Sequence, residues 1–362
     1  MIRVLVTDDS EVFRKLLGNL LERDPEIRVT GQASSGEEAV ERVLRQPDAF
    51  DVVTMDVQMP GMGGLEATRR LMGTAPLPIV VVSACWSPEE IDLTFRAMDA
   101  GAVEILPKPR DGEPLESYAQ ELTAKVRRAA SVRVLLPAPR HRAPKRLPSL
   151  RSEELQVVAV GASTGGPQAL KVLLPRLPAA FPLPILLVQH ITPGFEEGFV
   201  DWLGTLTPLP VRLARGGEGL SSPGILVAPA GAHLEADGTG RTVLSDAAPE
   251  HGVRPSVSVL FRSVARRYGN RGAAVLLSGM GRDGAEALGA IRQAGGTTFA
   301  QDEETSLIWG MPGEAVRLGT AEHVLPPEGI ATVLSGMIDP KKTRKEEPQN
   351  SEVKQDGQYR DA

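Results

Sequence analysis

Short apolar runs rich in β-branched residues alternate with longer amphipathic stretches along almost the whole chain. This alternation is typical of βαβ units on a parallel sheet. Doubly wound sheets of this kind carry their functional residues in loops that follow the carboxyl ends of the strands. The predicted strands of the first half are Arg3–Thr7, Arg28–Ala33, Val52–Met55, Ile79–Ser83 and Val103–Leu106, and those of the second half include Gln156–Val160, Ile185–Gln189, Ile225–Ala228, Ala273–Ser278 and Thr297–Ala300.

Two segments interrupt the alternation and divide the chain. Residues 131–152 contain four prolines and several arginines but no acidic residue, which favours an extended linker because prolines and unpaired like charges disfavour both helix and sheet. Residues 339–362 are nearly free of aliphatic side chains, so we expect a disordered tail. The sequence therefore predicts two α/β domains, at 1–130 and 153–338.

Composition excludes several classes of protein. The net charge is −6, which gives no electrostatic reason to expect nucleic acid or an anionic membrane as the main partner. Cys85 is the single cysteine, so no intramolecular disulfide can form and a reducing compartment is favoured. The apolar runs are too short to span a bilayer and the first residues do not resemble a secretory signal. We expect a cytoplasmic protein without membrane insertion.

Polar residues gather where the strands of the first half end. The residues are Asp8, Asp9, Asp56, Ser83 and Lys108. An oxygen-rich cluster of this kind suits Mg²⁺, and a carboxylate beside Mg²⁺ can attack a phosphoryl group. Any one of these residues alone is better explained as a helix cap. Five of them at the ends of four strands are not.

The first half resembles the response-regulator receiver family over its whole length, through the motifs at 8–10 (DDS), 55–61 (MDVQMPG) and 108–109 (KP). The resemblance implies a flavodoxin-like fold with Asp56 as the phosphorylated residue. It also implies that Asp8, Asp9, Asp56 and the Gln58 carbonyl hold Mg²⁺, and that Ser83 and Lys108 bind the phosphoryl oxygens. Receivers usually carry an aromatic residue three positions before the lysine, where this chain has Ile105.

In the second half, the strand ending at Val160 leads into the glycine-rich segment at 161–166 (GASTGG). This segment fits G-x-S-x-G, in which an exposed serine is held near backbone N–H groups. It also fits a helix N-terminus that binds phosphate. Ser163 is therefore a candidate nucleophile, and the motif alone leaves both readings open.

A nucleophilic serine needs a base, and the chain has five histidines. His141 lies in the predicted linker, His251 in a polar loop and His323 near the C-terminal end of the second domain. His233 follows a short glycine-containing turn and is a moderate candidate. His190 directly follows the apolar strand Ile185–Gln189, the topological position that Ser163 has after its own strand.

An acid at a third strand end completes the set. The strand Ala273–Ser278 runs into 279–284 (GMGRDG), where Asp283 lies between glycines. Such an acid can orient an imidazole and stabilise its charged form. The alternative for Asp283 is a helix N-cap. The order Ser, His, Asp differs from that of α/β-hydrolases, but triads recur on unrelated scaffolds.

The whole chain resembles the CheB family of chemotaxis protein-glutamate methylesterases. The matching motifs are those at 160–166, 189–195, 254–257, 278–284, 300–302 and 310–312. The resemblance implies a doubly wound, mainly parallel α/β methylesterase domain with a triad of Ser163, His190 and Asp283, and with Thr164 and Met280 near the oxyanion. Val253 and Ser258 stand where family members often have His and Asp.

The resemblance also implies the activity and the partners. It implies demethylation of glutamate methyl esters on chemoreceptors, with deamidation of certain glutamines, under control of a receiver phosphorylated by a histidine kinase. We expect a monomer, no metal in the second domain and no nucleic-acid partner. A response regulator with a DNA-binding output would need a basic helix-turn-helix in place of α/β patterning. A nucleotide-binding module would need G-x-G-x-x-G and an acid after its second strand, where this chain has Gln189 and His190.

Overall fold

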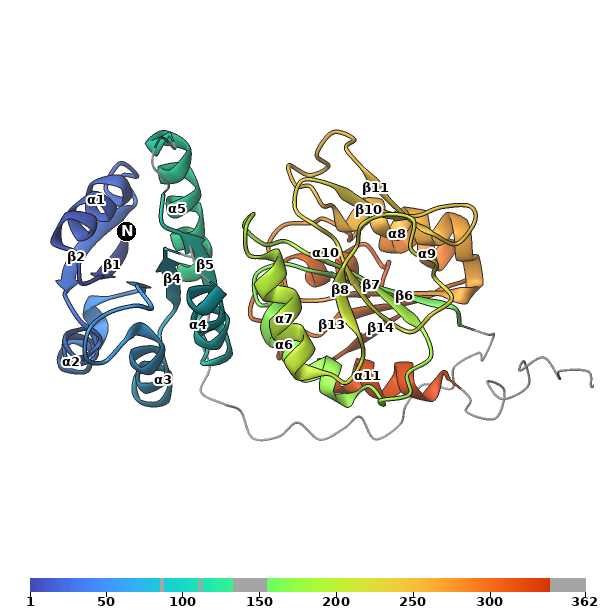
Figure 1. Cartoon of the computed structure of the whole chain (residues 1–362), viewed down its shortest axis with the longest axis horizontal. Coiled ribbons are helices and arrows are strands. Elements are labelled where there is room, and N and C mark those ends of the chain that lie inside the picture. The colour runs from blue at the N-terminus through green and yellow to red at the C-terminus, as the bar shows by residue number, and fades with distance from the viewer. Residues whose placement is uncertain (85–87, 110–111, 113, 133–154, 339–362) are drawn as a thin grey trace, which may run out of the picture.

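Each half of the chain folds around its own parallel sheet, and the two halves lie side by side (Figure 1). This is a computed structural model that describes residues 1–84, 88–109, 112, 114–132 and 155–338. The predicted linker, apart from Ser131 and Val132, and the predicted tail at 339–362 lie outside the described residues.

The first sheet has five parallel strands in the order β2-β1-β3-β4-β5. The predicted strands of this half are confirmed to within one residue at either end. Serine N-caps begin two of the helices, since the side chains of Ser10 and Ser35 accept the backbone N–H three residues later. The elements are β1 (Ile2–Thr7), α1 (Glu11–Leu21), β2 (Ile27–Ala33), α2 (Gly36–Arg45), β3 (Val52–Met55), α3 (Gly64–Thr74), β4 (Ile79–Ser83), α4 (Pro88–Asp99), β5 (Glu104–Pro107) and α5 (Leu115–Ala130).

The second sheet has seven strands in the order β14-β13-β12-β6-β7-β9-β8, and every neighbouring pair is parallel. From β6 the chain builds toward β7 on one side and later toward β12 on the other. The β6/β12 boundary is therefore the topological switch point, where sheets of this class place their sites. The strands are β6 (Val157–Ala162), β7 (Pro184–Gln189), β8 (Val211–Leu213), β9 (Gly224–Val227), β12 (Gly272–Leu276), β13 (Thr297–Gln301) and β14 (His323–Leu325).

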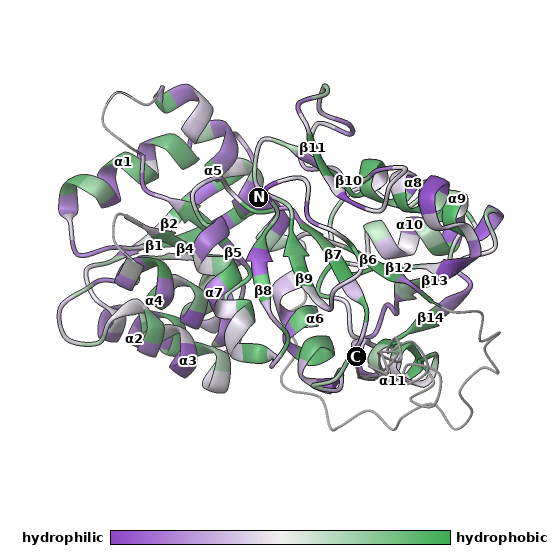
Figure 2. Ribbon diagram, turned by 45° about the vertical axis from the view of Figure 1, so that its right-hand side comes forward, coloured by the Kyte–Doolittle hydropathy of each residue, from purple (hydrophilic) through white to green (hydrophobic). Residues whose placement is uncertain are grey.

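Helices cover both faces of this sheet, so its central strands are buried throughout and read as continuous apolar runs (Figure 2). A separate antiparallel hairpin packs on α8. These elements are α6 (Gly166–Leu173), α7 (Glu196–Leu206), β10 (His233–Ala236), β11 (Thr242–Ser245), α8 (Val257–Tyr268), α9 (Leu288–Gln293), α10 (Met311–Arg317) and α11 (Pro327–Gly336).

The two halves meet through an aromatic cluster. Phe95 of α4 is buried, and its ring centroid lies 6.2 Å from Phe195, 5.9 Å from Phe199 and 6.0 Å from Trp202, the last two on α7. A hydrogen bond also joins the two halves, because the Gln168 side chain donates to the Ala102 carbonyl at 2.6 Å. Aromatic contacts of this kind stabilise the docked arrangement beyond the area that they bury.

Candidate functional site

Three loops meet at the carboxyl edge of the second sheet, around the β6/β12 switch point. Ser163 follows β6, His190 follows β7, and Asp283 lies in the loop after β12. The prediction that the first two strands are neighbours is confirmed, since β6 pairs with β7. The strand before Asp283 ends at Leu276, two residues earlier than predicted, and the rest of the motif forms a loop.

The turn that carries Ser163 is tight and closely covered. Gly165 adopts φ 81°, a left-handed conformation that favours glycine. The Ser163 N–H donates to the Ser278 carbonyl at 3.0 Å. A Cβ on Gly279 would lie 2.8 Å from the Cβ of Ser163, so only glycine lets the two loops approach. Glycines in the loops after β6 and β12 therefore allow the two loops to pack closely around Ser163.

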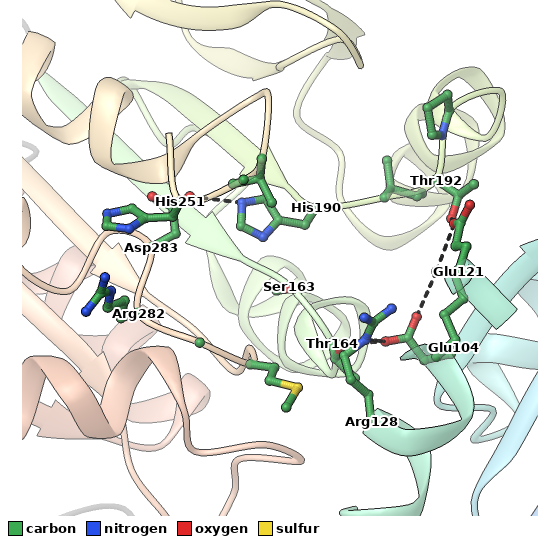
Figure 3. Close-up of a pocket in the computed structure, with 17 residues that line it drawn as sticks. Glu104, Glu121, Arg128, Ser163, Thr164, His190, Thr192, His251, Arg282 and Asp283 are labelled. Atoms are coloured by element: carbon green, nitrogen blue, oxygen red, sulfur yellow. Dashed lines mark hydrogen bonds and ion pairs between the residues drawn. The ribbon is translucent and has the colours of Figure 1, made fainter. Parts of the chain in front are cut away.

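His190 and Asp283 are hydrogen-bonded. The Nε2 atom of His190 lies 3.0 Å from Oδ2 of Asp283, and this leaves Nδ1 directed to the cleft that Ser163 also lines (Figure 3). No hydrogen bond joins Ser163 to His190 in the described chain, which is common for such pairs before substrate binds. The structure thus brings together the three residues predicted as a triad.

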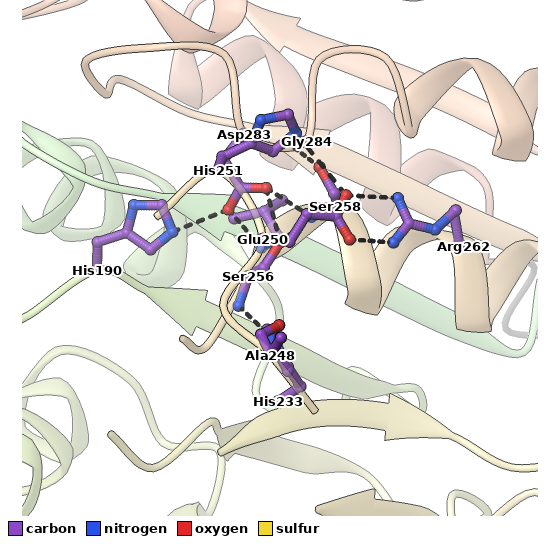
Figure 4. Close-up of polar contacts among 11 residues, drawn as sticks. His190, His233, Ala248, Glu250, His251, Ser256, Ser258, Arg262, Asp283 and Gly284 are labelled. Atoms are coloured by element: carbon purple, nitrogen blue, oxygen red, sulfur yellow. Dashed lines mark hydrogen bonds and ion pairs between the residues drawn. The ribbon is translucent and has the colours of Figure 1, made fainter. Parts of the chain in front are cut away.

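Asp283 is almost completely buried, and backbone N–H groups at the start of α8 satisfy it (Figure 4). Its Oδ1 accepts from the Ser256 hydroxyl at 2.8 Å and the Ser258 N–H at 3.0 Å, while Oδ2 also accepts from the Val257 N–H at 2.7 Å. Burial acts to raise the pKa of Asp283, but His190 and the donors of Ser258 hold that pKa well below its usual range. Asp283 is therefore a fixed carboxylate.

Two backbone N–H groups near Ser163 are free to bind an oxyanion. Within the described residues, the N–H groups of Thr164 and Met280 donate to no acceptor. The Ser163 N–H, in contrast, is already donated to Ser278. Preorganised donors of this kind stabilise the negative charge of a tetrahedral intermediate. Both residues predicted near the oxyanion therefore present a suitable group.

Residues of the first domain close one side of the cleft, a cavity of about 580 Å³. The Thr164 hydroxyl donates to Glu104 of β5. Glu104 also pairs with Lys125 at 3.1 Å and Arg128 at 3.2 Å. Burial acts to raise the pKa of Glu104, but the two cations lower it overall. A carboxylate of the first domain is therefore bound beside the candidate nucleophile.

Glu104 was not predicted to lie in this cleft, because the contact depends on how two separate sheets dock. It also missed the role of Ser256, which a capping pattern before α8 indicates only as a helix start. His233, the second candidate base, lies away from the cleft and is fully buried. The other histidine at this site, His251, lines the cleft without contacting Asp283 by any hydrogen bond.

Three acidic residues predicted as ligands in the first half lie together at the β1/β3 switch point. Asp8, Asp9 and Asp56 each offer an oxygen, and these atoms lie within 4.8 Å of one another. Lys108 contacts Asp8 at 2.6 Å and Asp56 at 2.7 Å. Burial is the main cause that raises the pKa of Asp56 to about 6, and Asp8 adds to it. A bound cation would stabilise the ionised form of Asp56, which fits a Mg²⁺ site.

Two further predicted residues lie at the same edge. The Ser83 hydroxyl is buried without a hydrogen-bond partner in the described structure, as expected of a group that awaits a phosphoryl oxygen. The Gln58 N–H donates to Asp56 at 3.3 Å, and its carbonyl accepts no hydrogen bond from described residues. Burial acts to lower the pKa of Lys108, but Asp56 and Asp8 raise it overall. Lys108 is therefore a fixed cation.

Comparisons with known proteins bear on both sites. The response regulator receiver domain family matches residues 4–120, and the CheB methylesterase family matches residues 158–334. The chain is 48% identical to a protein-glutamate methylesterase/protein-glutamine glutaminase of Geobacter metallireducens over 93% of this chain and 99% of that protein. It is 46% identical to a relative with the same description from Nitrosospira multiformis, over 93% and 97%.

A solved structure matches the second half. The CheB methylesterase catalytic domain of Thermotoga maritima superposes with a TM-score of 0.50 at 34% identity, covering 51% of this chain and all of that one.

None of the helices in the described part of the chain combines the length and apolar character needed to cross a membrane.

Proposed function

The chain belongs to the CheB family of receiver-controlled protein-glutamate methylesterase/protein-glutamine glutaminases, and we propose that Ser163, His190 and Asp283 carry out its chemistry. The observation that carries the proposal is the His190–Asp283 hydrogen bond of 3.0 Å in the cleft that Ser163 lines. The activity serves chemotaxis, and the substrates are chemoreceptors.

In the proposed acylation step, the Ser163 hydroxyl attacks the γ-carbonyl carbon of a glutamate methyl ester while Nδ1 of His190 takes its proton. The N–H groups of Thr164 and Met280 stabilise the oxyanion. The ester C–O bond then breaks, and His190 gives the proton to the departing methanol. Asp283 keeps the imidazole oriented and stabilises its charged form.

Hydrolysis completes the cycle. His190 takes a proton from water, which attacks the acyl carbon, and the bond to the Ser163 oxygen breaks as that oxygen regains a proton. The products are free glutamate and the original enzyme. A glutamine side chain follows the same course with ammonia as the leaving group. No group beyond the chain's own side chains and water is needed for the atoms to balance.

The receiver supplies the control. We propose that Asp56 attacks a phosphodonor to form an aspartyl phosphate, with a histidine kinase of the chemotaxis type as the natural donor. The carboxylates of Asp8, Asp9 and Asp56 and the Gln58 carbonyl would hold Mg²⁺, which neutralises phosphoryl charge when bound. Lys108 and Ser83 would bind phosphoryl oxygens. The acidic cluster and the unpaired Ser83 hydroxyl support this.

The docked receiver supports a proposal for how phosphorylation controls the hydrolase. Glu104 and Lys125 line the cleft together with Ser163, so the docked receiver occupies one side of the path by which a receptor helix would reach Ser163. We propose that phosphorylation weakens this docking in a monomeric enzyme. Within one chain, interfaces of this kind are displaced by modest energies.

Methanol release from methylated receptor membranes tests the proposal. The full chain, activated by acetyl phosphate and Mg²⁺, should release methanol, and the Ser163→Ala variant should not. Ser221→Ala is a matched control, because Ser221 is exposed and lies outside the cleft. Methanol release by Ser163→Ala at the wild-type rate would show that another nucleophile is used.

A further inference from the structure

His233 begins β10 and is fully buried outside the catalytic cleft, and both nitrogens of its ring have hydrogen-bond partners. The Ser256 N–H donates to Nδ1 at 3.1 Å, and Nε2 lies 3.2 Å from the Ala248 carbonyl (Figure 4). Nδ1 must lack a proton to accept the first bond, and Nε2 must carry one to donate the second. Only one neutral tautomer of His233 satisfies both neighbours.

The residue that His233 contacts is also a direct partner of the catalytic carboxylate. Ser256 is the N-cap of α8, and its hydroxyl donates to Oδ1 of Asp283 at 2.8 Å. The next two N–H groups of the same turn also donate to Asp283. Asp283 in turn holds Nε2 of His190 at 3.0 Å. Hydrogen bonds of the Ser256 backbone and side chain therefore link His233 to Asp283, and Asp283 is hydrogen-bonded to His190.

We propose that His233 is a positioning residue for Asp283, and that it acts by fixing the backbone of Ser256 so that the first turn of α8 holds the carboxylate toward His190. The proposal rests on the proposed function, because it presumes that Asp283 orients the catalytic base. His233 does not touch substrate and does not exchange protons during the reaction.

The energetics favour this role over simple space filling. A buried backbone N–H that loses its acceptor is costly, so removal of Nδ1 drives Ser256 to move toward another acceptor. Ser256 is fully buried and directly bonded to Asp283, so such a movement changes the carboxylate that orients His190. A space-filling residue would show no preference for an acceptor at Nδ1.

Three substitutions of His233 distinguish the contribution of the Nδ1 contact from that of the Nε2 contact. The amide oxygen of Asn lies about where Nδ1 lies, so His233→Asn keeps the acceptor for Ser256. The longer His233→Gln places its amide near Nε2 and keeps only the contact to Ala248. His233→Leu removes both. We expect kcat to fall about 10- to 100-fold in the Leu and Gln variants, as is typical of residues that orient a site from outside it, with little change in KM. The Asn variant should stay within about threefold of wild type.

The measurements use the full chain with acetyl phosphate, Mg²⁺ and methylated receptor membranes. Proton NMR supplies a second readout, because the proton shared by His190 and Asp283 should shift or broaden in the Leu and Gln variants and keep its wild-type position in the Asn variant. A cooperative thermal transition identifies the folded variants. If the Leu variant does not fold, the Asn and Gln variants are compared alone.

Equal kcat in folded Asn and Gln variants, whether both normal or both reduced, would overturn the proposal, since it would show no preference for the Nδ1 acceptor. A reduced kcat with an unchanged His190–Asp283 proton signal would overturn it as well. The Ser163→Ala variant distinguishes failure of the proposed triad from failure of the proposed role of His233. Activity in that variant refutes the triad itself, whereas a normal kcat in the folded Leu variant beside an inactive Ser163→Ala refutes only the role of His233.

Discussion

Two buried carboxylates of this chain have opposite electrostatic environments. Asp283 accepts hydrogen bonds from backbone N–H groups and from His190, and its pKa lies far below the usual range despite burial. Asp56 is also buried, and burial together with Asp8 raises its pKa to about 6 even though Lys108 opposes this. Asp283 is thus held ionised, as its proposed orienting role requires. Ionisation of Asp56, in contrast, has a free-energy cost that a bound cation can relieve.

The raised pKa of Asp56 predicts that Asp56→Asn stabilises the receiver in the absence of divalent cations. The pKa of Asp56 is higher in the folded state than in the unfolded state, so ionisation opposes folding. This cost is complete above about pH 6 and disappears as the pH falls toward 4. We expect a gain of about 1–3 kcal/mol in the free energy of unfolding at pH 8, measured by urea denaturation.

A control of opposite sign is available on the same sheet. The Arg3 guanidinium hydrogen-bonds Asp51 and lowers the pKa of that carboxyl, so Asp51→Asn should destabilise the receiver at pH 8. An Asp56→Asn protein less stable than wild type at pH 8 without divalent cations would contradict the prediction.

The triad assignment predicts large losses of turnover. Ser163→Ala and His190→Ala should each lower kcat by at least about 10³-fold, because removal of a triad member abolishes the nucleophile or its base. Asp283→Asn should be comparable or milder. Methanol release under saturating phosphodonor measures all three. A histidine variant within tenfold of wild type would show that His190 is not the base.

At the level of single residues, the sequence placed the strand-end groups well but not their partners. Ser163, His190 and Asp283 were predictable because parallel strands bring their carboxyl ends to one edge. The role of His233 was not, since its partner Ser256 lies 23 residues away in sequence and only the packed structure brings them together. A buried histidine gives the same sequence signal whether it acts as a base or as an acceptor.

Among secondary-structure elements, the fully buried strands were the most predictable. β3 and β4 were predicted with their observed bounds, because continuous β-branched runs between turn residues give a strong signal. β8 and β14, each three residues long and only partly buried, were not among the predicted strands. The β10–β11 hairpin was not predicted either, since its strands contain charged and polar residues and lie outside the main sheet.

The contact between helices α4 and α7 can be tested with one methyl group. A Cβ on Gly198 of α7 would lie 1.9 Å from Cγ2 of Ile91 and 3.0 Å from the ring of Phe95. Gly198→Ala should therefore force α4 away from α7 while it favours the α7 helix itself. We expect the basal methanol release of the unphosphorylated full chain to rise several-fold.

The same helix provides the matched control. Gly204 also lies in α7, and a Cβ there meets nothing within 4 Å. Gly204→Ala adds the same methyl group without a clash, so basal activity should stay unchanged. If Gly198→Ala folds normally and also leaves basal activity unchanged, contact between α4 and α7 does not limit access to the cleft.

Over the whole molecule, β5 lies between the two sites. Glu104 begins β5 and accepts a hydrogen bond from Thr164 beside Ser163, the proposed nucleophile, whereas Lys108 follows β5 and contacts Asp56. Four residues of extended chain span roughly 13 Å, so one short segment connects the proposed phospho-acceptor site to the turn that carries Ser163. Ile105, which stands where receivers usually have an aromatic residue, is buried within this segment. The polar contacts of Glu104 and Lys108 at the two ends of β5 are therefore candidates to couple the sites.

This arrangement predicts how the separated domains behave. A fragment that begins near Glu153 lacks Glu104 and α4, so it should release methanol faster than the unphosphorylated full chain and should not respond to acetyl phosphate. The full chain should accelerate when Asp56 is phosphorylated, and Asp56→Asn should abolish the response. Tenfold activation requires only about 1.4 kcal/mol of difference in docking free energy, which a new phosphoryl contact of Lys108 or Ser83 can supply. The rates of the three proteins, with and without acetyl phosphate, decide the matter. A folded fragment no faster than the unphosphorylated full chain would show that the docked receiver does not inhibit the enzyme by covering its cleft.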